Sequence, residues 1–210
     1  MGPGEWSLDA DTALMLKASA GDHPSFELLL ERHRTPVVNH LYRLVHNRAT
    51  AEDLAQDVFL RVYRARERYR PDAKFTTWLF RITTNIALNW RRDTRHENAQ
   101  ITLDDQARNI RKVEPRDQAL QPDERLVAEQ RARQIQAAVE SLPGKQLAAV
   151  VLHKYEGMEY REIADVLGCS IPALKSLLFR AYQTLRRRLA PLVEAQSVDV
   201  DNSNSRLASR

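Results

Sequence analysis

The chain has 210 residues, of which 43% are hydrophobic and 29% charged, and its net charge of +4 is only mildly basic, so the composition is typical of a globular protein. The single cysteine, Cys169, excludes an intrachain disulfide and a zinc site built from several cysteines. The longest apolar run, Leu147 to Leu152, is far shorter than the ~20 residues that span a bilayer, so we expect a cytoplasmic protein.

Between residues 22 and 92 the apolar residues recur at helical spacing, which predicts an all-α first half, and we take residues 11–93 as the first domain. One apolar stripe consists of Phe26, Leu29, Leu30, Val37, Leu41 and Leu44. A second consists of Leu54, Val58, Val62 and Ala65, and a third of Trp78, Leu79, Ile82 and Ile86. Each stripe is the buried face that an amphipathic helix requires.

Residues 94–122 lose this spacing, turn polar and contain Pro115, so we expect them to form a flexible linker. Helical spacing returns over residues 123–190, which we interpret as a second small α-helical domain with a turn at Pro143-Gly144. The polar residues 191–210 are predicted to be a disordered tail. The fold class is therefore all-α, with two small domains.

A helix-turn-helix is predicted over residues 160–179. Tyr160, Ile163, Ala164 and Leu167 occupy one helical face before Gly168-Cys169-Ser170 breaks the helix. Ser170 can cap the next helix, and Pro172 is tolerated in a first turn. The buried face of the second helix is predicted to be Ile171, Leu174, Leu178, Ala181, Leu185 and Leu189.

The opposite face of that second helix carries candidate DNA contacts, which are Lys175, Ser176, Phe179 and Arg180. From Leu174 to Pro191 there are five basic residues and no acidic one, which suits a polyanionic partner. Such side chains could reach bases and phosphates in a major groove, which is wide enough for one helix. The alternative is an ordinary helical hairpin whose basic face is merely solvated.

Two motifs resemble a known family. The run from Ala51 to Arg64, AEDLAQDVFLRVYR, is similar to the polymerase-binding helix of sigma region 2. The run from Gly157 to Gly168, GMEYREIADVLG, is similar to the first helix of sigma region 4. Their order, with no third domain between them, resembles the extracytoplasmic-function (ECF) group of the sigma-70 family. The resemblance implies a transcription initiation factor that is not an enzyme and needs no cofactor or small-molecule substrate.

The resemblance also implies that the first motif docks on the clamp of core RNA polymerase, formed by its β′ and β subunits. The residues implied are Asp53, Leu54, Gln56, Asp57, Leu60, Arg61 and Arg64. Asp53 and Asp57 lie four residues apart on one helical face and would attract a basic partner. Without the resemblance, a solvated acidic edge is the simpler interpretation.

The loop and helix that follow resemble the part of region 2 that captures a base of the promoter −10 element. The residues implied are Tyr69, Asp72, Lys74, Phe75, Arg81, Asn85, Asn89 and Arg92. Aromatic rings can stack on an unstacked base, and asparagines spaced by four can line one face. Core packing is the alternative for Phe75 and the favoured interpretation for Trp78, and solvent exposure is the alternative for the asparagines.

In the second domain the implied contacts to the −35 element are Lys175, Ser176, Phe179 and Arg180. The chain departs from the family pattern at Pro172-Ala173, where Gly-Thr is frequent, and at Leu177, where Arg is frequent. We therefore expect a −35 preference unlike that of well-known members. The resemblance further implies control by an anti-sigma factor.

Two other classes of function remain open from the sequence. A free-standing helix-turn-helix regulator would bind duplex DNA without polymerase. A metal-dependent nuclease or hydrolase could use Asp53 and Asp57 with His33, His40 or His46, although the histidines are predicted to lie on a different helix from the two aspartates.

Overall fold

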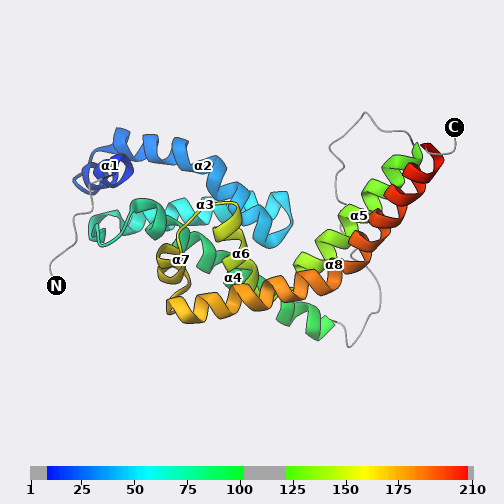
Figure 1. Cartoon of the computed structure of the whole chain (residues 1–210). Coiled ribbons are helices and arrows are strands. Elements are labelled where there is room, and N and C mark those ends of the chain that lie inside the picture. The colour runs from blue at the N-terminus through cyan, green and yellow to red at the C-terminus, as the bar shows by residue number, and fades with distance from the viewer. Residues whose placement is uncertain (1–8, 102–121, 208–210) are drawn as a thin grey trace.

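The computed structural model describes the backbone of residues 9–101 and 122–207 (Figure 1). All regular structure within these ranges is helical, which confirms the predicted all-α class. The first group of helices comprises α1 (Ala10–Ser19), α2 (His23–Val45), α3 (Arg48–Ala65), the short 3-10 helix η1 (Arg66–Arg68) and α4 (Phe75–Ile101). The second comprises α5 (Pro122–Glu140), α6 (Gly144–Lys154), α7 (Tyr160–Leu167) and α8 (Ile171–Leu207).

Helices α2, α3 and α4 pack against one another and bury the predicted apolar stripes. Leu41 and Leu44 of α2, Val58 of α3 and Leu79 of α4 are inaccessible to solvent. Phe26 and Leu54 lie at the edge of the stripes and are only partly buried. Burial of these aliphatic side chains is the main source of stability in the first domain.

Helix α1 holds the start of α4 in place. The Oγ1 atom of Thr12, which is buried, accepts a hydrogen bond of 3.2 Å from the backbone N–H of Phe75, the first residue of α4. First-turn amides have no partner within their own helix, so a side chain from elsewhere must satisfy them if they are buried. Asp11 of α1 also bonds to Arg32 and His33 of α2. The hydrogen bond from Phe75 holds the start of α4 against α1, and the Asp11 contacts hold α1 against α2.

Replacement of Thr12 by valine is expected to lower the free energy of unfolding by roughly 1–3 kcal/mol, because the buried N–H of Phe75 then has no acceptor. The measurement is urea unfolding followed by circular dichroism. The matched control is Thr12→Ser, which keeps the hydroxyl group. Equal losses in the two variants would show that the hydrogen bond is unimportant.

Helix α4 continues beyond the predicted end of the first domain. The sequence placed a linker from residue 94, whereas the helix extends to Ile101. Residues 94–101 contain neither glycine nor proline, so nothing in them stops a helix, although they have no apolar face that would signal one. The greater part of the predicted linker, residues 102–121, lies outside the described residues.

The second group contains the predicted helix-turn-helix, formed by α7 and α8. Helix α7 ends at Gly168, whose φ of 60° lies in the left-handed region that favours glycine. The Ser170 side chain accepts a hydrogen bond from the N–H of Ala173, as predicted for a cap, and Pro172 lies in the first turn of α8. The core beneath consists of Leu147, Leu152, Ile163, Leu174, Leu178 and Ala181.

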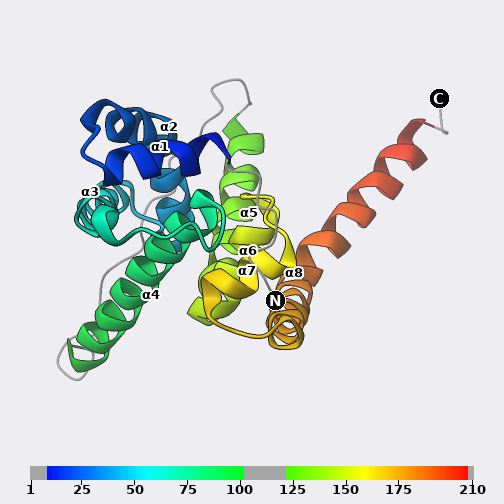
Figure 2. The same ribbon diagram turned by 90° about the vertical axis from the view of Figure 1, so that its left-hand side faces the viewer.

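Two details of α8 differ from the predictions. Ile171 was placed on the buried face, but it is 41% exposed because it is the first residue of the helix and lies beyond the packed turns. Residues 191–210 were predicted to be disordered, whereas α8 continues through Pro191 to Leu207, and Figure 2 shows its last turns projecting away from the other helices. A proline inside a helix removes one backbone hydrogen bond and crowds the carbonyl of residue i−4, but here the helix continues past Pro191.

The two groups of helices pack against each other. Helix α7 contacts α4, and α6 contacts both α2 and α4, as the central part of Figure 1 shows. Apolar residues of both groups belong to one continuous core. Among the described residues, no helix combines the length and apolar character needed to cross a membrane.

Candidate functional site

The outer face of α3 carries the predicted polymerase contacts. Asp53, Gln56 and Asp57 are exposed, as are Arg61 and Arg64. Leu60 lies among them and is 51% exposed, whereas Leu54 is half-buried at the edge of the core. An exposed leucine surrounded by charged residues is typical of a surface that binds another protein, because the apolar centre is desolvated and the charged rim orients the partner.

The loop before α4 does not present its aromatic rings to solvent. Tyr69 and Phe75 were predicted to stack on DNA, but both are buried, and their ring centroids are 6.3 Å apart. Trp78, for which core packing was favoured, is half-buried with its ring 5.0 Å from that of Tyr69. Burial also raises the pKa of Tyr69. These rings support the loop from inside in this structure.

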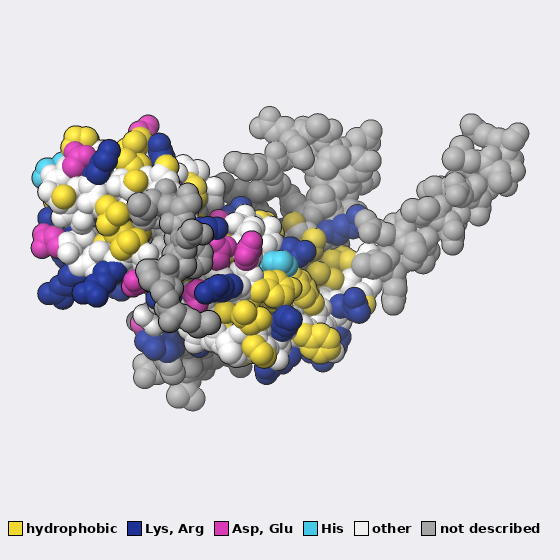
Figure 3. Space-filling model, turned by 60° about the vertical axis from the view of Figure 1, so that its left-hand side comes forward, with side chains coloured by type: hydrophobic (Ala, Val, Ile, Leu, Met, Phe, Trp, Pro, Cys, Tyr) yellow, Lys and Arg dark blue, Asp and Glu magenta, His cyan; other side chains and the backbone are white. Residues whose placement is uncertain are grey.

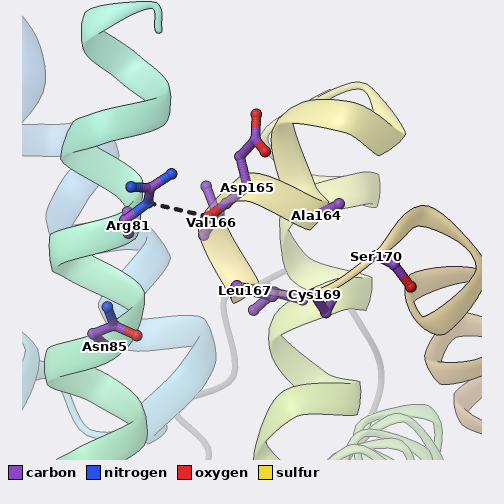
Figure 4. Close-up of a pocket in the computed structure, with 9 residues that line it drawn as sticks. Arg81, Asn85, Ala164, Asp165, Val166, Leu167, Cys169 and Ser170 are labelled. Atoms are coloured by element: carbon purple, nitrogen blue, oxygen red, sulfur yellow. Dashed lines mark hydrogen bonds between the residues drawn. The ribbon is translucent and has the colours of Figure 1, made fainter. Parts of the chain in front are cut away.

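The polar residues predicted on α4 and the loop before it are all exposed, and they are Asp72, Lys74, Arg81, Asn85, Asn89 and Arg92. Two of them contact the second domain. Lys74 Nζ lies 2.9 Å from Glu162 Oε1, and Arg81 Nε donates a hydrogen bond of 3.1 Å to the backbone oxygen of Asp165 (Figure 4). A cleft of about 580 Å³ lies between Arg81 and Asn85 on one side and residues 164–170 on the other.

The ion pair between Lys74 and Glu162 shifts the pKa of both groups. The hydrogen bond to Glu162 raises the pKa of Lys74 above its ordinary value of 10.5. Burial alone would raise the pKa of Glu162, but hydrogen bonds from Lys74 and from the N–H of Glu159 outweigh it and lower this pKa below 4.5. Both groups are therefore ionised between pH 4.5 and 10.5, and the attraction is lost as the pH falls through the lowered pKa of Glu162 or rises through the raised pKa of Lys74.

The predicted DNA contacts of α8 lie on its exposed face. Lys175, Ser176 and Arg180 are exposed, and the ring of Phe179 is 62% exposed. Arg180 Nε donates to the backbone oxygen of Ser176, which orients the guanidinium along the helix. In the lower part of Figure 3, basic side chains are interspersed with hydrophobic ones on the molecular surface. Cations beside an exposed aromatic ring suit a partner that has both phosphates and apolar base edges.

A second set of contacts between the domains was missed by the sequence analysis. His40 of α2 is completely buried, with Nε2 3.0 Å from Thr84 Oγ1 and Nδ1 3.2 Å from Glu156 Oε1. Arg43 lies 3.7 Å from the same Glu156 oxygen, and its guanidinium lies over the ring of Tyr155 at 4.4 Å. No local pattern could reveal these pairs, since the partners are far apart along the chain.

Two of the three histidines considered for a metal site, His33 and His40, have other partners here, and His46 is the residue that caps the C-terminus of α2. His33 bonds to Asp11, and His40 bonds to Thr84 and Glu156, so neither faces Asp53 or Asp57 of α3. In the part of the chain that the structure describes, no three His, Cys, Asp or Glu residues are grouped so that they could hold a metal ion.

Comparison with known proteins shows which family the chain matches. The model of sigma-70 region 2 matches residues 29–97, and that of sigma-70 region 4 matches residues 132–185. The chain is 36% identical over 185 residues to the ECF RNA polymerase sigma factor SigE of Mycolicibacterium smegmatis, covering 87% of this chain and 69% of the relative. It is 29% identical over 191 residues to the RNA polymerase sigma-H factor of Pseudomonas aeruginosa, covering 88% and 96%.

Solved structures share the fold. CnrH, in complex with the cytosolic domain of CnrY, has a TM-score of 0.62 at 23% identity, covering 89% of this chain and 99% of CnrH. The sigma factor RpoE, in complex with the anti-sigma factor NepR from Bartonella quintana, has a TM-score of 0.59 at 21% identity, covering 79% and 96%. The chain therefore belongs to the ECF sigma factors of the sigma-70 family, transcription initiation factors that bind core RNA polymerase and direct it to promoters without being enzymes.

Proposed function

We propose that three exposed helix faces divide the work of promoter recognition. The acidic face of α3 with Leu60 at its centre binds the polymerase clamp, the polar face of α4 holds the melted −10 strand, and α8 reads the −35 duplex. The observation that carries this proposal is the exposure of all three faces on helices whose opposite sides are buried. In the same scheme, residues 11–93 act as region 2, residues 94–122 as the link and residues 123–190 as region 4.

The −10 contacts are proposed for the polar face of α4, with Asp72 and Lys74 at its start. Asn85 and Asn89 can read base edges, while Arg81 and Arg92 can neutralise phosphates. Tyr69 and Phe75 support the loop from the core, and a role for them in stacking requires the loop to open. This assignment needs only side chains that are exposed to solvent, of which Lys74 and Arg81 also contact the second domain.

The −35 contacts are proposed for Lys175, Ser176, Phe179 and Arg180. Pro172 and Ala173 offer no hydrogen-bond donor to a base, so specificity must come from the second and third turns of α8. Because each domain contributes one modest contact to the same promoter, tethering raises the effective concentration of the second contact.

The protein is proposed to act in the cytoplasm under the control of an anti-sigma factor. The structurally similar RpoE is in complex with an anti-sigma factor, which supports a partner of this class. The decisive test is transcription with purified chain and core polymerase on fragments of its own genome. We expect promoter-dependent transcripts, and their complete absence would refute the proposed function.

Substitution of Asn85 and Asn89 together by alanine is expected to weaken binding of holoenzyme to a fork-junction promoter by about 30-fold or more, since each of the two base contacts contributes ~1–3 kcal/mol. The assay is fluorescence anisotropy with a labelled non-template −10 strand. Binding to a duplex that holds only the −35 element should not change. Gln134→Ala, an exposed substitution on α5, is the control and should match the unaltered protein.

A further inference from the structure

The basic residues of α8 continue beyond the turns that are proposed to read the −35 element. The proposed contacts end at Arg180, whereas Arg186 and Arg187 lie nearly two turns farther along the same helix and are not among them. Both side chains are exposed. Residues 174–191 contain no acidic side chain, so this part of α8 presents positive charge without a neighbouring carboxylate in the sequence.

The guanidinium groups of Arg186 and Arg187 are also unpaired in three dimensions. In the part of the chain that the structure describes, neither side chain forms an ion pair or a hydrogen bond. The exposed Arg48 of α3 is different, because its Nε lies 2.7 Å from Glu52 Oε1 on the same helix. An exposed arginine without such a partner keeps all its donors available for another molecule.

Helical geometry places these two arginines on the same face as the proposed −35 contacts. Arg186 follows Lys175 by 11 residues, and Arg187 follows Ser176 by the same number. Eleven residues are close to three full turns of an α-helix, so each pair lies in one row along α8. The residues between them on this face are exposed as well, and they are Phe179, Arg180, Tyr182 and Gln183. One continuous exposed face therefore runs from Lys175 to Arg187.

This face is longer than a major groove can hold. Helix α8 is continuous through these turns (Figure 1), and it rises by about 18 Å from Lys175 to Arg187. The major groove of B-DNA is only about 12 Å wide and about 8.5 Å deep. If the turns from Lys175 to Arg180 contact base edges, the helix leaves the groove within the next two turns. The groove is bordered by phosphates, so Arg186 and Arg187 come level with the DNA backbone.

We propose that Arg186 and Arg187 bind phosphates of duplex DNA just outside the −35 element. The planar guanidinium group matches the oxygens of a phosphate, and such contacts fix the register of a helix on DNA without reading its sequence. They anchor α8 from its far side, whereas Pro172 and Ala173 at its start offer no side-chain donor. The inference rests on the proposed reading role of α8 for the position of the DNA, but phosphate binding itself can be tested without a promoter.

Arg188 provides a control on the same helix. It is exposed and has the same charge, but it follows the buried Ala181 by seven residues and therefore lies on the core side of α8. Its loss removes a charge without removing a group from the face between Lys175 and Arg187. Combined with loss of the exposed Lys17 on α1, it gives a double variant that matches the change in charge.

The salt dependence of duplex binding tests the phosphate contacts in the full chain. Arg186→Gln with Arg187→Gln is compared with the parent on a labelled duplex of random sequence, by fluorescence anisotropy. Each lost phosphate contact reduces the slope of log K against log salt by about 0.9, so we expect the slope to fall by about two and the difference in affinity to shrink about tenfold between about 50 and 200 mM salt. Arg188→Gln with Lys17→Gln should keep the slope of the parent, and all variants should keep its helical circular dichroism.

Shortened duplexes test where the contact lies. A promoter duplex that the parent binds is cut back to the edge of the −35 element on one side or on the other. On one of the two shortened duplexes, we expect the parent to lose about tenfold in affinity and to bind no better than Arg186→Gln with Arg187→Gln. The base preference within the element should be the same for both proteins, because the two arginines read no base.

Equal salt slopes for the two double variants would overturn the inference, because a general loss of charge would then explain any effect. So would a loss that is seen only in holoenzyme and not in the chain without polymerase, which would assign the two arginines to an acidic protein surface. If the slopes differ as expected on random duplex but no promoter is transcribed, the proposed function fails while the phosphate contacts stand.

Discussion

Replacement of Asp53 and Asp57 together by lysine is expected to weaken binding of core RNA polymerase by about 100-fold, since truncating or opposing charge pairs at a protein interface costs ~2–5 kcal/mol. The two carboxylates lie four residues apart on the exposed face of α3, one helical turn from each other. They flank a patch that contains the exposed Leu60, so their reversal would place two cations beside the docking centre. The measurement is the dissociation constant of labelled chain and core enzyme.

The matched control is Glu27→Lys with Glu31→Lys. These glutamates are also exposed and four residues apart, but they lie on α2, and their reversal changes the net charge by the same amount. We expect this pair to retain polymerase binding within about twofold. Equal losses in the two double variants would indicate a general electrostatic effect and would remove α3 from the proposed interface. Unfolding curves should be unchanged in both, because none of the four side chains is buried.

Substitution of Lys175 or Arg180 by alanine is expected to weaken binding of holoenzyme to its promoter by about 5- to 150-fold each, the effect of losing ~1–3 kcal/mol of base or phosphate contact. If the substituted residue contacts a phosphate, its loss should weaken binding to all DNA sequences equally and reduce the slope of log K against log salt by about one. If the residue reads a base, its loss should instead relax the base preference at one position of the −35 element. Filter binding at several salt concentrations distinguishes the two roles.

Lys17→Ala is the control for this pair. Lys17 is exposed on α1, in the first domain, and its removal makes the same change in charge. Promoter binding should differ from that of the parent by less than twofold. If Lys175→Ala and Arg180→Ala behave like this control, α8 is not the reading helix. The helix-turn-helix would then be a structural hairpin with a solvated basic face, the alternative that the sequence left open.

The local sequence was sufficient to predict the helix-turn-helix, because each feature of this motif depends on residues that are neighbours in the chain. The left-handed Gly168, the Ser170 cap and Pro172 in the first turn of α8 were all found where the pattern indicated. Helix α4 extends past the boundary placed at residue 94, because loss of an apolar face marks the end of packing and not the end of a helix. Ile171 was misplaced for a related reason, since helical periodicity does not show where the neighbouring elements end.

The candidate site could be predicted only in part from the sequence. The exposed residues of α3, α4 and α8 were chosen by residue type and spacing, and those properties are local. Burial of Tyr69 and Phe75 could not be predicted in this way, because it depends on the packing of α1, α2 and Trp78 around the loop. An aromatic residue has the same type and spacing whether it stacks on a base or on another ring.

The sequence by itself determined the packed parts of the helices, the order of the two sigma motifs and the chemistry of each exposed face, because these follow from helical periodicity and residue type. Only the tertiary structure decided that α7 lies on α4 and that His40 bonds to Glu156, 116 residues later in the chain. Such contacts depend on how two helical groups pack, and neither partner carries a local signal of the other.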